Sequence, residues 1–418
     1  MYTETDAVHP FELLLPVAPA APESWACVAC DQFTSEPDYW AKVSGLVANR
    51  PSTLNLMLPE CYLSESEKRI PQIHHAMQQA LDQGILRPAV QNGYVLCERT
   101  TASGTRLGLV CTVDLEQYDF TPGTLSPIRP TEQTISSRLP ARLAIRRGAP
   151  LELSHILILI DDPRHTVLEP LRERKASFRS LYDFDLMLDG GHLSGWAIDS
   201  EEDLSLISQS MHALRASLGE NPLFLAVGDG NHSLATAKAY WNEIRETLSE
   251  TERKSHPARF ALCEIENIHD PALLFEPIHR LLSGVNKNDL LRAWHDYAAS
   301  RGMHLSENGS GHAFTLISAS DEQRLVVSQP EGAIPCETLQ KFLDDFLNQH
   351  SEVSIDYIHG EQSLRSLASE PDHLGFLLPS IDKHSFFDDV KKLGVLPRKT
   401  FSMGEAREKR YYMECKRI

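Results

Sequence analysis

Short apolar runs that stop at turn residues constrain this chain more than any other feature of its sequence. Residues 156–160 are all isoleucine or leucine and are followed by a turn that contains Pro163. Residues 106–113 and 223–227 are largely apolar runs of similar length. Such a short run, rich in branched apolar side chains and closed by a turn, predicts a buried strand rather than a helix.

Helix signals lie between these runs. Residues 64–67 match a capping box, which predicts a helix to about residue 83. Ser200 predicts the start of a helix to about residue 218, and a third helix is expected from Leu234 to about residue 250. Strands and helices alternate without a regular β-α-β period, which favours an α+β fold of mixed sheets with peripheral helices over a doubly wound sheet.

Chain length sets an expectation for the number of domains. At 418 residues the chain is too long for one ordinary core, so two to three structural units are expected. We expect an N-terminal α+β region at 1–125, a central region at 126–285 and a C-terminal α+β region at 286–418. No segment approaches the roughly 20 apolar residues that cross a bilayer, and the N-terminal residues lack a secretory pattern. The sequence therefore predicts a cytoplasmic protein with no membrane partner.

The charge distribution points to a confined anion site. A formal charge of −18 argues against a surface built for nucleic acid. Positive charge is concentrated in two stretches, one at 129–147 that holds Arg129 and Arg138, and the other at 391–418. The second has nine basic residues against three acidic ones. Local positive charge in an acidic protein suggests an anion site, and each stretch alone fits an ordinary solvated face equally well.

The strand expected at 223–227 runs directly into a turn that carries reactive side chains. Two glycines allow a tight turn and a close approach of a ligand to the backbone. The first N–H groups of the helix that follows have no partner within the helix, and its dipole favours an anion there. A phosphate site is therefore predicted at this turn, which consists of Gly228, Asp229, Gly230, Asn231, His232 and Ser233.

Two side chains of the turn add chemistry to this site. A carboxylate such as Asp229 acts as a metal ligand or a base, and a histidine such as His232 titrates near neutral pH. The segment is not a Walker loop, and Ser233 occupies the position of the third glycine of a dinucleotide fingerprint. An ordinary Asp-Gly turn with Asn231 or Ser233 capping the helix explains the same spacing, and spacing alone favours it.

Four segments together resemble the domain-of-unknown-function 1015 family. They correspond to the opening of the family, its acidic motif, its signature turn with the following helix, and its closing motif. The resemblance covers nearly the whole chain, and it implies a ParB/sulfiredoxin-like core, a group that includes free-serine kinases. The segments are residues 29–35 with Tyr39 and Trp40, residues 128–134 with Arg138, residues 227–238 and residues 396–405.

The resemblance to the kinases implies roles for individual residues. Glu132 would be the general base toward a substrate hydroxyl, and Asp229 and His232 would hold phosphate or metal. The implied cofactors are Mg2+, with Asp229 as its first ligand, and ATP or ADP.

The chain departs from the kinase motif at two positions of the turn. Asn231 replaces a histidine, and Ser233 replaces an arginine that clamps phosphate. Three basic residues elsewhere in the chain are expected to supply the missing charge. They are Arg129, Arg138 and Lys399.

The leading hypothesis is a nucleotide-dependent phosphotransferase that acts on a small hydroxyl substrate such as free serine. The alternative is a non-catalytic nucleotide-binding or regulatory protein. A nucleic-acid partner is disfavoured by the acidic balance, and the sequence carries no signal for the oligomeric state. Cys27 and Cys30 form a Cys-x-x-Cys pair, for which two structural thiols are favoured over redox chemistry or half a zinc site. Residues 189–192 predict a hairpin connection.

Overall fold

The computed structural model describes residues 6–34, 36–135, 139–220, 222–397 and 399–418. Contacts divide the chain into two compact units. Unit 1 comprises Met1–Leu274 and Ala406–Ile418, and unit 2 comprises Phe275–Glu405. The C-terminal residues belong to unit 1 because they pair with its strands. The three ranges expected from the sequence stay a prediction.

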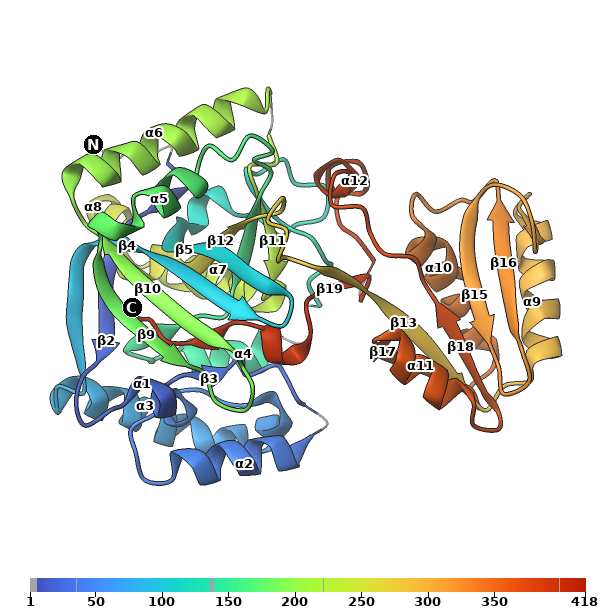
Figure 1. Ribbon diagram of the computed structural model, residues 1–418, viewed down its shortest axis with the longest axis horizontal. Helices are drawn as coiled ribbons and strands as arrows, with labels where there is room; N and C mark the ends of the chain where they lie inside the picture. The colour runs from blue at the N-terminus through green and yellow to red at the C-terminus, as the bar shows by residue number, and fades with distance from the viewer. Residues whose placement is uncertain (1–5, 35, 136–138, 221, 398) are drawn as a thin grey trace. The chain divides into compact units, whose positions relative to one another are not determined.

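Unit 1 is built on one large, mostly antiparallel sheet (Figure 1). Its strands are β1 (Val8–His9), β2 (Phe11–Pro16), β4 (Leu86–Thr101), β5 (Gly104–Asp114), β6 (Ile128–Pro130), β7 (Leu151–Leu153), β8 (Leu157–Ile160), β9 (Arg179–Asp185), β10 (His192–Ile198), β11 (Leu225–Asp229), β12 (Phe260–Asn267) and β21 (Cys415–Arg417). They follow the order β6-β11-β8-β12-β5-β4-β2-β21-β7, with β1 on β5 and β10 between β4 and β9. Two pairs are parallel, β6 with β11 and β8 with β12. The expected α+β class with mixed sheets is confirmed.

Both faces of the sheet are buried at its strands β5, β8 and β11, which explains why these strands are nearly continuous apolar runs. On β5, Val110 belongs to one apolar core, whereas Leu109 and Cys111 belong to another. Successive side chains of a strand point to opposite faces, so the two cores lie on the two sides of the sheet.

Helices of unit 1 cover both cores (Figure 1). Helices α2 and α3 contribute side chains to the first core, and α6 and α7 to the second. None of the helices in the described ranges has the length and apolar character needed to cross a bilayer. The helices are α1 (Pro22–Trp25), α2 (Pro37–Val47), α3 (Ser66–Asp82), α4 (Leu139–Arg146), α5 (Glu169–Glu173), α6 (Glu201–Ser217), α7 (Asn231–Arg245) and α8 (Glu250–Ser255).

Local signals predicted some element boundaries correctly. Ser200 caps α6, since its hydroxyl accepts the N–H of Asp203 at 3.1 Å. The hairpin expected at residues 189–192 is confirmed, because β9 and β10 pair antiparallel on either side of it. The capping box expected at residues 64–67 is wrong. Ser64 lies inside a 3-10 helix, η2 (Glu60–Glu65), which leads directly into α3, and no side chain caps α3.

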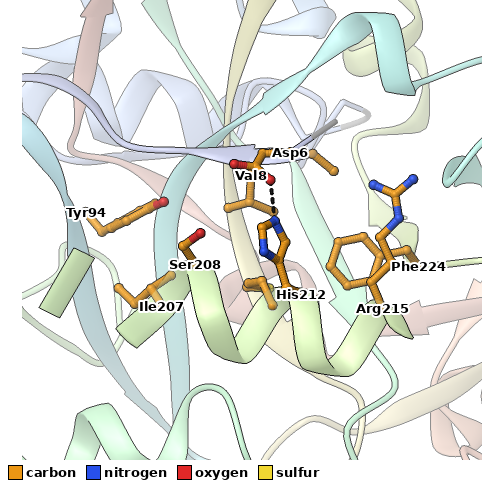
Figure 2. Close-up of a pocket in the computed structure, with 10 residues that line it drawn as sticks. Asp6, Val8, Tyr94, Ile207, Ser208, His212, Arg215 and Phe224 are labelled. Carbon is orange, nitrogen blue, oxygen red and sulfur yellow. Dashed lines mark hydrogen bonds and ion pairs between the residues drawn. The ribbon is translucent and has the colours of Figure 1, made fainter. Parts of the chain in front are cut away.

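The first described residues of the chain are held to α6 at a small surface hollow (Figure 2). The side chain of Asp6 is only 4% exposed and pairs with His212 of α6. The hollow has a volume of about 20 Å³ and is also lined by Tyr94 and Phe224. A space of this size holds about one water molecule, so it serves packing rather than ligand binding.

The C-terminal segment is fixed in unit 1 by buried ion pairs. Arg410 Nε lies 2.7 Å from Glu264 Oε2, and Arg410 Nη2 lies 2.7 Å from Glu414 Oε2. Burial alone would lower the pKa of Arg410, but the two carboxylates raise it above its ordinary value. The strand β20 (Tyr411–Tyr412) lies within this segment and pairs with β3 (Cys27–Val28).

Unit 2 is a second sheet with helices packed on it. Its strands are β13 (Phe275–Ser283), β14 (His304–Ser306), β15 (His312–Ile317), β16 (Glu322–Ser328), β17 (Ser354–His359), β18 (His373–Leu377) and β19 (Phe401–Met403), and its helices are α9 (Lys287–Ser300), α10 (Pro335–Gln349), α11 (Glu361–Ala368) and α12 (Phe386–Leu393). The strand order is β14-β16-β15-β18-β13-β17, with β19 on β13. Trp294 of α9 stacks on Phe342 of α10, with 4.8 Å between the ring centroids. It contacts Phe376 of β18 edge-on, with 5.5 Å between the centroids.

Replacing Arg410 by alanine is expected to destabilise the protein by about 3 to 5 kcal/mol, because Glu264 and Glu414 would stay buried without a counter-charge. Urea unfolding at neutral pH measures this loss. Arg417→Ala is the matched control, since the side chain of Arg417 is 51% exposed and lies 3.5 Å from Glu12. The control is expected to change stability by less than about 1 kcal/mol. Equal losses in both variants would show that the buried pairs are not what fixes the segment.

Candidate functional site

The predicted glycine turn is present between β11 and α7. Gly228 lies at a shift of register between β11 and β8, and Gly230 has a φ of 77° and occupies the N-cap of α7. A Cβ atom on Gly230 would lie 3.1 Å from the Cα atom of Ile156, so both the backbone conformation and the space favour glycine. No side chain of the described residues caps α7. The N-terminus of the helix therefore keeps the partial positive charge that attracts anions.

The segment that carries Glu132 is tied to this turn at two points. Asn231 Oδ1 accepts the N–H of Thr131 at 3.0 Å, and His232 Nε2 accepts the N–H of Ile135 at 3.2 Å. Because β6 runs parallel to β11, the residues that follow the two strands meet at the same edge of the sheet. Glu132 thus lies between two hydrogen-bonded anchors on the first turn of α7, although it is about 100 residues away in sequence.

Asp229 is held as a charged carboxylate by two donors. Its Oδ2 atom lies 3.1 Å from Lys409 Nζ, and its Oδ1 atom accepts the N–H of Gly230 at 2.8 Å. Burial would raise the pKa of Asp229, but the charge of Lys409 and the hydrogen bond from the Gly230 N–H lower it below the ordinary value. Asp229 is therefore ionised at neutral pH, and a buried lysine stands beside the helix N-terminus.

A buried histidine lies on the other side of the turn. His155 Nδ1 is 2.7 Å from the hydroxyl of Tyr412, and His155 Nε2 is 3.1 Å from Ser233 Oγ. The Tyr412 hydroxyl accepts the N–H of Cys30 at 3.3 Å, which favours donation of its own proton to Nδ1. The proton of the imidazole is then on Nε2, which faces Ser233 and lies 3.6 Å from Asp31 Oδ2.

The set of Ser233, His155 and Asp31 is not a hydrolytic triad. In a triad the carboxylate orients the imidazole through Nδ1 while the serine faces Nε2. Here Tyr412 occupies Nδ1, and both the serine and the carboxylate are on the Nε2 side. The arrangement is suited to donating a hydrogen bond at the turn rather than to activating Ser233 as a nucleophile.

A cavity of about 140 Å³ adjoins the turn on the side of Ser233. His155, Ser233, Thr236 and Tyr412 are among the polar residues that line it. Most of its remaining wall is apolar, with two ion pairs set into it, Arg142 with Glu60 and Arg146 with Glu152. The apolar lining comprises Leu56, Met57, Leu58, Leu63, Met77, Ile145, Ala149, Leu151, Leu153 and Ile156.

The basic residues expected to supply charge lie in different places. Arg129 is on β6 and only 6% exposed, its Nε atom donates to the carbonyl of Ser126 at 2.7 Å, and burial lowers its pKa. Arg138 falls outside the described residues. Lys399 belongs to unit 2, whereas the turn belongs to unit 1. Among the described residues of unit 1, Lys409 brings a positive charge to the turn.

Three residues of this site were not predicted, namely His155, Lys409 and Tyr412. Lys409 was part of the basic tail, and that charge excess was the only sequence signal for it. His155 stands one residue before a buried strand run, and Tyr412 lies in a buried two-residue strand. Neither position carries a spacing pattern, because each meets the turn only through long-range folding.

The cysteines and the possible metal ligands complete the inventory of reactive groups. All eight cysteines are free, and the Cys27 thiol lies 3.3 Å from the hydroxyl of Ser52 within the core. This arrangement agrees with the interpretation of Cys27 and Cys30 as structural thiols. Across the described ranges, no group of three His, Cys, Asp or Glu side chains is arranged to hold a metal ion.

Comparison with known proteins identifies a matching family model. The model described as "Protein of unknown function (DUF1015)" matches residues 8–346. No curated protein matches the chain.

Solved structures give weak likenesses. A free serine kinase in complex with AMP is 13% identical, with a TM-score of 0.38, and the alignment covers 73% of this chain and 87% of that chain. A conserved hypothetical protein from Pyrococcus furiosus is 13% identical, with a TM-score of 0.36 and coverage of 74% and 94%. SbnI with a C-terminal truncation, from Staphylococcus aureus, is 9% identical, with a TM-score of 0.36 and coverage of 70% and 81%. Likenesses at these TM-scores carry no conclusion about this chain.

Replacing Asp229 by asparagine is expected to lower stability at neutral pH by about 1 to 3 kcal/mol, because Lys409 loses its charged acceptor. The pKa of Asp229 is lowered by folding, so the pair stabilises the protein above the ordinary pKa of about 3.9, and the stabilisation is lost as pH falls through the folded value. Urea unfolding across this range should therefore show the variant and the native protein converging in acid. Asp199→Asn, at an exposed pair with Arg179, is the control and should change little. A difference that does not depend on pH would contradict the assignment.

Proposed function

This chain belongs to the DUF1015 family, and from that premise we propose that it is a nucleotide-dependent phosphotransferase that acts on a small hydroxyl substrate such as free serine. The observation that supports this most is the convergence at one helix N-terminus of three features. These are the Glu132 segment, the glycine turn and the pair of Asp229 with the buried Lys409. Phosphoryl transfer requires mainly positioning, positive charge on the phosphate and a group that orients the nucleophile, and these features supply all three.

Phosphate recognition is proposed at the first turn of α7. The helix is not capped by a described side chain, so its N–H groups and dipole favour an anion. Lys409 has three donors, so it can keep its contact with Asp229 at 3.1 Å and still donate to a phosphate oxygen. The backbone of Gly228, Gly230, Asn231 and Ser233 would line this phosphate site, with charge from Arg129, Arg138 or Lys399 as a further proposal.

Glu132 is proposed as the general base. The hydroxyl oxygen of the substrate forms a bond to the transferred phosphorus, and the bond from that phosphorus to the bridging oxygen of the nucleotide breaks. The bonding electrons leave with the nucleotide oxygen, and the hydroxyl proton passes to the Glu132 carboxylate. The anchors at Thr131 and Ile135 fix the segment that carries this carboxylate, so the base is held in place before the substrate arrives.

Mg2+ fits the residues at the turn in one respect. Each oxygen of Asp229 accepts one hydrogen bond or ion pair, which leaves a lone pair on each for a cation. When bound, Mg2+ would neutralise charge on the phosphates, with phosphate oxygens and water as its other ligands. His232 is proposed to assist at the phosphate, and the nucleotide is proposed to be ATP or ADP.

We propose a ParB/sulfiredoxin-like core in unit 1 and a cytoplasmic location. The proposed partners are a nucleotide and a small molecule. The charge of −18 disfavours a nucleic acid as a partner.

A non-catalytic nucleotide-binding or regulatory protein is the second candidate. One observation favours it. The side chain of Asn231 is buried and hydrogen-bonded to Thr131, so it does not take over the function that the histidine has in the kinase motif. Tight binding of ADP without turnover across a panel of hydroxylated metabolites would support this candidate.

Glu132→Gln is expected to reduce turnover at least about 100-fold while nucleotide binding is retained, because only the proton acceptor is lost. Consumption of ATP or ADP in the presence of Mg2+ and serine measures turnover, and calorimetry measures binding. Glu250→Gln is the matched control, since Glu250 is 89% exposed on α8. Unchanged turnover in Glu132→Gln would remove Glu132 from the role of base.

A further inference from the structure

The cavity beside the turn is large enough for a small molecule with an apolar body. Its volume is about 140 Å³, and Met57, Met77 and Leu151 are among the side chains of its apolar wall. An apolar cavity of about 150 Å³ is known to hold a molecule the size of benzene. A ring or a short alkyl chain placed against this wall would lose contact with water, which favours binding.

The arginines in the wall of this cavity already have carboxylate partners. Arg142 pairs with Glu60, and Arg146 Nη1 donates to Glu152 Oε1 at 2.9 Å. The Nε and Nη2 atoms of Arg146 are buried, and its Cζ atom lies 5.8 Å from the centroid of the Tyr240 ring, outside the cavity. Neither arginine therefore offers an unused positive charge to a ligand.

The remaining charges around the cavity complete a neutral set. Glu152 Oε2 lies 3.3 Å from Lys416 Nζ, and Asp31 Oδ2 lies 3.6 Å from His155 Nε2. A ligand that brought its own charge into the cavity would leave water without finding an unused opposite charge, which is unfavourable. The wall therefore favours an uncharged ligand. The balanced groups are the carboxylates of Asp31, Glu60 and Glu152 and the cations of Arg142, Arg146 and Lys416.

The hydroxyl of Ser233 has a hydrogen to donate at this wall. Its oxygen accepts a hydrogen bond from His155 Nε2 at 3.1 Å, because the proton of this imidazole lies on Nε2. Among the described residues, none accepts the proton of the Ser233 hydroxyl itself. Thr236, the next hydroxyl along α7, is satisfied, since it donates to the carbonyl of His232 at 2.7 Å. Ser233 can therefore donate to one oxygen of a ligand.

We propose that this cavity binds a small uncharged alcohol with an apolar body. The oxygen of the ligand accepts the proton of the Ser233 hydroxyl, and the apolar body lies against Met57 and Met77. Free serine carries two charges and has no apolar body, so this cavity excludes it. Binding of the alcohol requires neither a nucleotide nor Glu132, and it therefore does not rest on the proposed function.

A titration with benzyl alcohol in the absence of nucleotide tests the ligand class. Methyl 13C resonances of Met57 and Met77 should shift and reach saturation, whereas that of Met211 in the opposite core should not shift. Benzoate and benzylammonium carry a charged group on the same ring and should bind at least roughly tenfold more weakly. Equal binding of either charged analogue, or no shift with benzyl alcohol, would overturn the proposal.

Ser233→Ala tests the polar contact. It should weaken benzyl alcohol by about three- to tenfold and leave toluene, which has no oxygen, nearly unchanged. In this variant the Nε2 hydrogen of His155 still has Asp31 Oδ2 at 3.6 Å. Ser217→Ala is the matched control, because Ser217 is exposed on α6. Equal weakening of both ligands, or no weakening of benzyl alcohol, would contradict donation by Ser233.

A larger side chain in the wall tests the position of the ligand. Ala149 lines the cavity, so Ala149→Leu should fill part of it and weaken benzyl alcohol and toluene at least roughly tenfold. Ala299→Leu, at an exposed position of α9, is the control and should leave both affinities unchanged. Circular dichroism confirms that each variant is folded. Native affinity in folded Ala149→Leu would overturn the proposal, as would a shift of the Met57 and Met77 resonances by free serine offered alone.

Discussion

The site depends on the burial of Arg410 between Glu264 and Glu414. A buried arginine with two carboxylates at 2.7 Å fixes the path of the C-terminal segment through unit 1. The neighbours of Arg410 in the chain then reach the glycine turn from its two sides, Lys409 at Asp229 and Tyr412 at His155. Removal of Arg410 would leave Glu264 and Glu414 buried without a counter-charge, so the segment is specified strongly and the side chains at the turn are specified with it.

A second constraint joins the two halves of the proposed active centre. The parallel pairing of β6 with β11 brings residues 131–135 beside the first turn of α7. Asn231 uses its side-chain oxygen to hold Thr131, so its role in the structure is to connect two segments, and only its backbone N–H remains for a ligand. This role of Asn231 is compatible with the proposed site, in which phosphate would be bound by backbone N–H groups and Lys409.

Sequence patterns predicted the features of this fold that are encoded locally. The apolar run at residues 156–160 became β8, and the run at 223–227 became most of β11. The turn at Gly230 was predictable from its glycines. In the structure, the left-handed backbone of Gly230 and its close packing against Ile156 both require glycine. The start of α6 followed from the hydroxyl of Ser200. The capping box at residues 64–67 failed because a 3-10 helix already occupied that segment, and a four-residue pattern does not contain this information. Lys409, His155 and Tyr412 were missed because their positions at the turn follow from long-range contacts rather than from spacing.

Hydrogen–deuterium exchange with and without ADP tests most directly whether an anion is held at the N-terminus of α7. If the phosphates lie there, three segments that are distant in sequence should become protected together, namely residues 131–135, 228–234 and 406–412. Protection that is confined to other parts of the chain, with no change in these three segments, would contradict the proposed site.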